Sequence, residues 1–507
     1  MRARRAPTLL ASLLLAGTIQ TAGARDDGGL HVEFTGNAYL YVMRIVRSSA
    51  TLFLDNLGVH FLEGAWLEGV GGGINADVEV SPRLRFNTGL GGSVWSPAQT
   101  KLSRADWLGR RENAWINSAS ATVLLGDLDR PPLQMKFGFF GFNTSPDAKD
   151  FGGYLYKGGC YPGYLYSGGG GASVAGLQLH SDYFDFVTLD GLVTLELEYP
   201  YFDFSFGLVP TFHVGDFLDV GAGLLAHRAI PAVDTLTIPT SEQKGASEGY
   251  TLQGTKAMAR FSLDTRKAFD IEALGENDLK LYAEAAIMGV KNYPAIEVSD
   301  EETGEVVEVG YTDILERIPV MAGFNWPTHP LVAHGAVPAA LSAFLIGIEP
   351  DSTWPIDTLL DGQGEDSVVS ATEVRGFEYK SWRMAAFGGA AVVAGVGTFV
   401  LEKVLRTRLR LDYLTLEVEY YRLPHENHAI YDGNPVPVRP RPGFEPGQDD
   451  WRWAVLARKT LAERFTISAK VASDHFRTFN EFNWPDPEER ILGTDEWYWR
   501  LTFGVGF

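Results

Sequence analysis

Charged side chains occupy alternate positions within several otherwise apolar segments, and this spacing limits the chemistry they can do. Successive side chains of a β-strand point to opposite faces, so a charge between two apolar residues faces away from them. Where the apolar face meets lipid, the charged face borders a water-filled space. The charged side chains there can bind water or select between cations and anions, and neither role requires a covalent step. The predicted lumen-lining residues are Arg83, Arg85, Lys136, Lys256, Arg260, Lys280, Glu284, Arg452 and Lys470, with Asp77, Glu79, Glu417 and Glu419 as further inward acids.

Motifs for covalent or metal chemistry lack the context that would make them work. Ser247 lies between Gly245 and Gly249 at nucleophile-elbow spacing, but no buried strand precedes it and no helix follows, which favours a flexible loop. His425 and His428 are three residues apart without a third ligand at a familiar spacing. Cys160 is the only cysteine, so an internal disulfide is excluded. We expect no enzymatic activity, no metal and no cofactor.

Period-two apolar alternation recurs along the chain and predicts strands that would position the charged residues. Short connections alternate with long ones, as in an antiparallel barrel. Sixteen strands would enclose a water-filled lumen. The predicted strands lie at 32–42, 70–80, 84–90, 115–125, 133–139, 172–181, 191–199, 201–213, 218–228, 255–264, 279–291, 313–325, 413–422, 451–459, 465–477 and 497–507.

The last predicted strand is the clearest. Apolar residues alternate from Trp497 through Phe503 and Val505 to the terminal Phe507, which gives a strand long enough to cross a membrane at a tilt. In this feature the chain resembles bacterial outer-membrane proteins, whose final strand commonly ends in Phe. The resemblance implies an all-β transmembrane barrel, with Phe503, Val505 and Phe507 acting as the signal for the barrel-assembly machinery.

The connection at 143–171 is the third long loop of the predicted barrel. It is rich in glycine and tyrosine and carries Asp147, Lys149, Asp150 and Lys157. In the sixteen-stranded porins that this architecture resembles, the third loop folds into the barrel and narrows it. The resemblance therefore implies a constriction here, with those four charged side chains hydrated in the pore. An ordinary surface loop, with glycines serving its turns, is the alternative.

One segment, 327–411, does not fit the pattern, because a short turn is expected there. It contains two apolar stretches, 331–348 and 384–401, each about as long as a membrane-spanning helix. We favour a helical hairpin packed in or beneath the barrel, since Ala386, Ala390 and Ala394 recur at a spacing that allows close helix approach. An extra strand pair, giving eighteen strands, and an inner-membrane hairpin are the alternatives.

The N-terminus reads as an export signal. Arg2, Arg4 and Arg5 precede a short apolar run and then small residues at Ala22 and Ala24, which predicts a signal peptide over 1–24 and a single barrel over 25–507. The net charge of −21 disfavours nucleic acid as a partner. The content of 12% aromatic residues and 56 glycines is compatible with aromatic girdles and tight turns.

These features together lead to three functional hypotheses. The first is a porin-like passive channel for small hydrophilic solutes in the outer membrane of a Gram-negative cell envelope, in contact with lipid and able to form homo-oligomers as porins do. The second is a barrel enzyme, such as a lipase or protease. The third is a structural or assembly protein whose 327–411 insertion plugs the pore or holds a partner.

Overall fold

The fold is seen in a computed structural model of the chain. The structure describes residues 30–47, 64, 66–99, 111–157, 172–197, 202–232, 254–271, 274–290, 296–299, 306–309, 314–328, 411–421, 451–474 and 496–507. The signal peptide predicted at 1–24, Ser247, the two histidines at 425 and 428, Cys160 and nearly all of the 327–411 insertion lie outside these ranges.

Sixteen antiparallel strands form one closed barrel, which confirms the predicted fold class and strand number. Each strand pairs with its sequence neighbours, and the last pairs with the first. The barrel strands are β1 (His31–Arg47), β2 (Trp66–Ser81), β3 (Leu84–Gln99), β4 (Arg111–Leu125), β5 (Leu133–Phe142), β6 (Ala172–Phe184), β7 (Val187–Leu195), β8 (Phe204–Val214), β9 (Leu218–Ile230), β10 (Gly254–Asp264), β11 (Lys280–Met288), β14 (Val320–Trp326), β15 (Tyr413–Tyr420), β16 (Trp451–Leu461), β17 (Phe465–Ser473) and β18 (Trp497–Gly506).

Within the described parts of the connections there are a short helix, a two-stranded sheet and a 3₁₀ turn. A four-residue helix, α2 (Thr265–Ala268), follows β10 and is capped by the Asp264 carboxylate, which accepts the N–H of Lys267. A separate two-stranded sheet, β12 (Ile296–Ser299) with β13 (Val306–Val309), and a 3₁₀ turn, η3 (Ile314–Arg317), lie between β11 and β14. Among the described residues, no helix combines the length and apolar character needed to cross a membrane.

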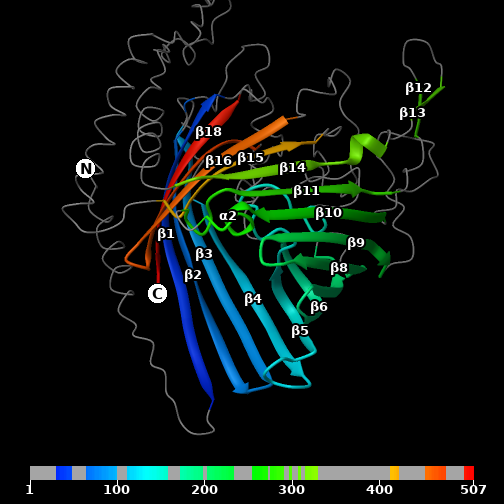
Figure 1. Ribbon diagram of the computed structural model, residues 1–507. Helices are drawn as coiled ribbons and strands as arrows, with labels where there is room; N and C mark the ends of the chain where they lie inside the picture. The colour runs from blue at the N-terminus through cyan, green and yellow to red at the C-terminus, as the bar shows by residue number, and fades with distance from the viewer. Residues whose placement is uncertain are drawn as a thin grey trace, which may run out of the picture.

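The seam between β1 and β18 closes the ring, and Figure 1 shows the two strands side by side. The N–H of Gly36 donates to the carbonyl of Phe507 at 2.9 Å, and the N–H of Phe507 donates back to Gly36 at 3.0 Å. A Cβ on Gly36 would lie 2.4 Å from Cζ of the Phe507 ring, so the glycine makes room for the terminal aromatic side chain. The C-terminal residue thus contributes to closure.

Short connections gather at one end of the barrel, here called the turn end, where β1 begins and β18 ends; the other end is the loop end. Several predicted strand boundaries were wrong by four residues or more, as at β3, which continues to Gln99 rather than ending at 90; two of the errors have a local structural cause. β6 and β7 meet in a tight hairpin at Asp185 and Phe186, so β7 begins at Val187 rather than 191. β14 begins at Val320, because η3 occupies the residues predicted as its start.

The insertion predicted at 327–411 joins two strands that pair directly, because β14 runs beside β15 with Ala322 opposite Val418. The barrel closes with these neighbours in contact, so the alternative of eighteen strands is wrong. Thr328, just after β14, is held by the Asp278 carboxylate, which accepts both its N–H and its hydroxyl at 2.9 Å. The helical hairpin remains a prediction.

The outward face of the barrel is apolar and exposed, as alternation predicts. On β8, for example, Phe204, Phe206 and Leu208 are exposed while Ser205 is buried on the inward side. One side chain was placed on the wrong face: a bulge at Asn117 makes Ile116 pair with the outward Leu90, and Trp115 pair with Gly91. Trp115 therefore faces inward, because one extra residue reverses the alternation.

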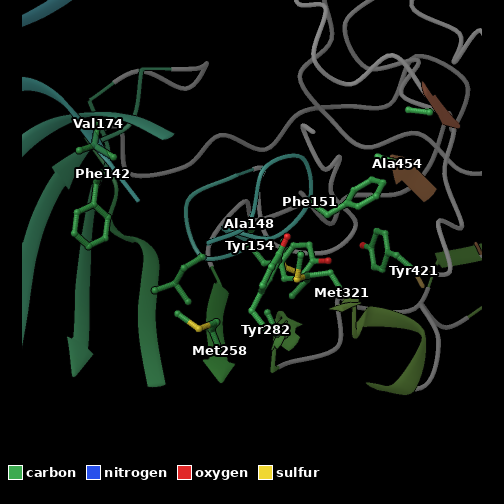
Figure 2. Close-up of a cluster of buried hydrophobic side chains, with 14 of the residues drawn as sticks. Phe142, Ala148, Phe151, Tyr154, Val174, Met258, Tyr282, Met321, Tyr421 and Ala454 are labelled. Carbon is green, nitrogen blue, oxygen red and sulfur yellow. The ribbon is translucent and has the colours of Figure 1, made fainter. Parts of the chain in front are cut away.

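The inward face is divided into two zones. Near the turn end it is polar, as predicted, with residues such as Thr188, Asp190 and His213. Toward the loop end, apolar side chains also point inward and pack together, which simple alternation did not predict. Figure 2 shows part of this cluster. Its wall members include Phe140, Phe142, Val174, Leu192, Val209, Leu225, Met258, Tyr282, Met321 and Tyr421.

Candidate functional site

The described part of the third loop, residues 143–157, lies against the inner wall, and its side chains complete the interior cluster. Ala148, Phe151, Tyr154 and Leu155 are all buried. In Figure 2, Phe151 and Tyr154 gather with Tyr282 of β11. The apolar inward residues of the loop-end wall therefore have a partner: they pack against this loop, which we call the inner loop.

Glu417 on β15 is the principal anchor of the inner loop. One carboxylate oxygen accepts the N–H groups of Asp150 at 2.8 Å and Phe151 at 2.9 Å. The other oxygen accepts the N–H of Lys149 at 2.6 Å and the hydroxyl of Tyr282 at 2.7 Å. Glu417 has no exposed surface. Hydrogen bonds to an ionised acceptor are each worth roughly 1.5–3 kcal/mol, so this side chain holds three consecutive residues firmly.

Glu284 on β11 is a second anchor of the same kind. Its carboxylate accepts the N–H of Gly153 at 2.9 Å, the N–H of Tyr154 at 2.7 Å and the hydroxyl of Ser145. Gly152 and Gly153 have φ values of +76° and +71°, a conformation that other residues adopt at a cost. The two glycines therefore let successive N–H groups converge on one carboxylate.

Cations and a third acid add further links between wall and loop. Lys256 on β10 donates to the carbonyl of Leu155 at 2.9 Å. Lys280 on β11 lies 3.4 Å from Asp147, which also accepts the Ser262 hydroxyl at 2.5 Å. The third acid of the wall, after Glu284 and Glu417, is Glu419 on β15. Its carboxylate accepts hydrogen bonds from the hydroxyl of Tyr154 at 2.8 Å and the guanidinium of Arg452 at 3.2 Å.

The four charged loop residues divide into two pairs. Asp147 and Lys149 are partly exposed. Asp150 and Lys157 are only 1% and 8% exposed, so the expectation that both are hydrated in the pore is not met. Burial lowers the pKa of Lys157, while nearby carboxylates, Asp150 first among them, oppose that effect. Asp150 and Lys157 thus belong to the packed interior.

Asp150 shares a buried ammonium with a second acid. Lys470 on β17 donates to Asp150 and, at 2.5 Å, to Asp474. Burial raises the pKa of Asp150 to about 7; Lys470 opposes this rise, and the carboxylates of Asp474 and Glu417 add to it. One ammonium facing two carboxylates explains why one of the acids retains its proton more readily.

This raised pKa predicts a dependence of stability on pH. Asp150 in the unfolded chain titrates near its ordinary value of 3.8, so its protonation contributes stability that is present below about pH 4 and lost as pH rises through about 7. We expect the free energy of unfolding in urea, measured in lipid vesicles, to fall less between these pH values for Asp150→Asn than for the wild type. Parallel pH profiles for the two proteins would contradict the assignment, and Asp185→Asn, at the exposed β6–β7 hairpin, is the control.

The other predicted lumen residues lie as follows. Lys136 faces inward, with its ammonium 5.2 Å from the centre of the Phe140 ring. Arg260 donates to the Thr211 hydroxyl at 2.9 Å. Arg85 is exposed and lies 3.9 Å from Glu79. Arg83 is not on a strand: it lies in the β2–β3 turn and donates to the Gly126 carbonyl at 2.7 Å. Alternation had placed it in β3.

A second polar group crosses β7, β8 and β9 near the turn end and was not foreseen. Thr188 Oγ1 lies 2.8 Å from His213 Nε2, and His213 Nδ1 lies 2.7 Å from Asp219 Oδ1. The three residues come from separate strands, so no sequence spacing brings them together. Within the described ranges, no group of three or more His, Cys, Asp and Glu side chains is arranged to hold a metal ion.

Sequence reasoning identified the anchoring side chains but not what they anchor. Glu284 and Glu417 were expected to face inward, as they do, yet the N–H groups that they accept lie more than 100 residues away along the chain. The alternation of a strand specifies its faces and carries no signal for a loop that packs on one of them. The run of glycines at 152–153 was the available indication of an unusual backbone.

Comparisons with solved structures find porins among the similar proteins. No family model matches the chain, and no curated protein matches it. Among solved structures, Salmonella typhi OmpF in complex with daunomycin is 8% identical with a TM-score of 0.42, covering 95% of this chain and 99% of that one. A mutant of the Rh. blastica porin is 8% identical with a TM-score of 0.37, covering 94% and 100%. The chain resembles porin-type barrels, and its own fold is established by the strand pairing of a closed sixteen-strand barrel.

Proposed function

We propose that this protein is a porin-like passive channel for small hydrophilic solutes, and that it resides in the outer membrane. The observation that carries the proposal is the inner loop, which Glu284 and Glu417 bind inside a closed sixteen-strand barrel. A barrel of this strand number encloses a wide lumen unless something narrows it. A loop bound to one side of the interior limits the passage to the space between it and the opposite wall.

The outward face supports placement in a membrane. Its side chains form an exposed apolar surface around the barrel, and a Lys or Arg at the centre of such a surface in lipid costs roughly 2–4 kcal/mol. Export through a cleaved signal peptide, delivery by the barrel-assembly machinery through Phe503, Val505 and Phe507, and homo-oligomer formation belong to the same proposal. Asp147 and Lys149, partly exposed on the inner loop, are the loop charges available to passing ions.

Solute flux into vesicles tests this function. The purified chain is folded into liposomes, and swelling rates are measured with neutral solutes of increasing size. We expect swelling above that of protein-free liposomes, with a rate that falls steeply as solute size increases. Swelling equal to protein-free liposomes, in a sample whose barrel is folded by its heat-modifiable gel mobility, would refute the channel.

Hydrolysis is the second candidate function, because Thr188, His213 and Asp219 have the nucleophile, base and acid contacts of a catalytic triad. We rank it below the channel, because backbone N–H groups in paired strands are engaged in the barrel and do not supply an oxyanion hole. Hydrolysis of a chromogenic ester that disappears in Thr188→Ala would establish it. Equal rates for the wild type and this variant would dismiss it.

A further inference from the structure

The inward face of β1–β4 differs from the rest of the wall because it carries no charge over most of its height. The described inward positions at 37–41, 67–75, 87–93 and 113–120 include no Asp, Glu, Lys or Arg. The strands that hold the inner loop, by contrast, present Lys256, Lys280, Glu284, Glu417 and Lys470 inward. We call the uncharged region the neutral wall; it comprises Asn37, Tyr39, Tyr41, Leu67, Gly69, Gly71, Gly73, Asn75, Asn87, Gly89, Gly91, Ser93, Asn113, Trp115, Asn117, Ser118 and Ser120.

Trp115 is the most prominent side chain of the neutral wall. A Cβ on Gly91 would lie 2.6 Å from both Cε2 and Nε1 of the indole, so the ring lies across this glycine. The indole N–H donates to the side-chain oxygen of Asn117, which fixes the orientation of the ring. The side chain is nevertheless 38% exposed, although it faces the interior. Trp115 thus has one side on the wall and the other open to the lumen.

Two tyrosines extend this aromatic surface. Tyr39 and Tyr41 of β1 lie across Gly71 and Gly69 of β2, since a Cβ on either glycine would fall within 2.6 Å of ring atoms. The two rings are stacked, with centroids 6.5 Å apart. Tyr39 is partly exposed and Tyr41 is buried, so Tyr39 is the second inward ring of the neutral wall, after Trp115, that a solute can reach.

Amide side chains surround these rings. Asn37 is exposed and accepts the N–H of Gly73 at 2.9 Å through its side-chain oxygen, which leaves its amide NH₂ directed elsewhere. Asn113 is exposed one inward position from Trp115. An amide offers both a donor and an acceptor without a charge. The wall therefore combines flat apolar rings with neutral groups able to pair with hydroxyls.

We propose that the neutral wall binds neutral saccharides as they pass through the lumen. A pyranose ring has an apolar C–H face that stacks on an aromatic side chain and a rim of hydroxyls that both donate and accept hydrogen bonds. Uncharged amides satisfy those hydroxyls, whereas a fully ionic wall would favour ions. This inference rests on the proposed channel and names its preferred solute class.

Two measurements separate the inference from the channel function. Isothermal titration calorimetry of the folded full chain with maltotriose measures binding whether or not the barrel conducts. Ion current through reconstituted channels, measured during titration with the same trisaccharide, reports whether the bound sugar lies in the passage. We expect saturable binding and a matching partial block of the current.

Removal of the indole should weaken both signals. We expect Trp115→Ala to raise the dissociation constant and the half-blocking concentration by at least about fivefold, since an aromatic contact of this size contributes on the order of 1 kcal/mol. Trp115→Phe keeps an aromatic ring, so its dissociation constant and half-blocking concentration should lie between those of Trp115→Ala and the wild type. It also tests the proposal if Trp115→Ala does not fold. Trp451→Ala, which removes an outward and exposed indole on β16, is the matched control and should leave both values unchanged.

The outcomes have distinct meanings. The saccharide inference would be overturned if maltotriose gave no heat of binding, or if the wild type and Trp115→Ala bound it with equal affinity. An ion current in either case would still support the channel. Binding without current from folded protein would retain the saccharide site and refute the channel.

Discussion

Replacing Glu417 by alanine should release the inner loop and widen the conducting path. The three N–H groups of Lys149, Asp150 and Phe151 would lose their acceptor inside a packed interior, and each buried donor left unsatisfied costs roughly 1–3 kcal/mol. The free energy is therefore lower when the loop leaves the wall and water hydrates those N–H groups. We expect single-channel conductance in planar bilayers to rise about twofold or more, with noisier open levels, because pore radius sets conductance.

Two further variants make this prediction specific. Glu417→Gln keeps one acceptor oxygen but turns an NH₂ group toward donors, so it should give an intermediate increase. Glu79→Gln removes another inward carboxylate, which is partly exposed and lies 3.9 Å from Arg85 near the turn end rather than at the loop, so it should leave conductance unchanged. An Ala variant at 417 that folds and conducts like the wild type would show that the inner loop does not depend on this anchor.

A second large effect is expected at Gly138, where β5 passes β4. Its φ of +119° is a conformation that residues with side chains rarely adopt, and a Cβ there would lie 2.2 Å from the carbonyl oxygen of Ala119. Neighbouring Gly176 on β6 is under the same constraint, with a Cβ position 2.1 Å from the Val193 oxygen. β5 precedes the third loop and β6 follows it. Strain at Gly138 and Gly176 would therefore disturb the part of the barrel to which that loop is attached.

We expect Gly138→Val to abolish folding of the barrel or to lower its unfolding free energy by several kcal/mol, on the order of a backbone outlier plus a steric clash. Urea titration followed by heat-modifiable gel mobility measures this loss. Gly141→Val is a closely matched control on the same strand, because a Cβ at Gly141 meets nothing within 4 Å. Similar stability for the two variants would mean that the paired glycines are not required.

The sequence was most informative where one face of a strand is uniformly apolar. Alternation in β8 and β18 identified both strands and their outward sides, because a surface exposed to lipid tolerates few exceptions. It failed at the β6–β7 hairpin, where Tyr183, Phe184 and Phe186 continue an apolar run through the turn and no glycine or proline marks it. The bulge at Asn117 could not be predicted either, because no particular residue type marks the insertion of one extra residue in a strand.

The interior was harder to predict than the exterior. Phe140 and Met258 face inward and pack against the inner loop, yet in sequence they look like any lipid-facing residue. Charged positions such as Glu284 and Lys470 were correctly expected to point inward from their spacing. Their partners could not be inferred, because contacts such as Lys470 with Asp150 join residues that only barrel closure and loop folding bring together.

The central claim is that the inner loop borders the path that solutes take, and chemical modification at Asp147 tests it most directly. In a Cys160→Ser background, Asp147→Cys places a thiol at a partly exposed loop position, and a bulky cationic thiol reagent is added while single channels are recorded. We predict a stepwise fall in conductance on labelling, and no change when the thiol is placed by Asp185→Cys at the exposed turn-end hairpin. Complete labelling at residue 147 with unchanged conductance would contradict the claim.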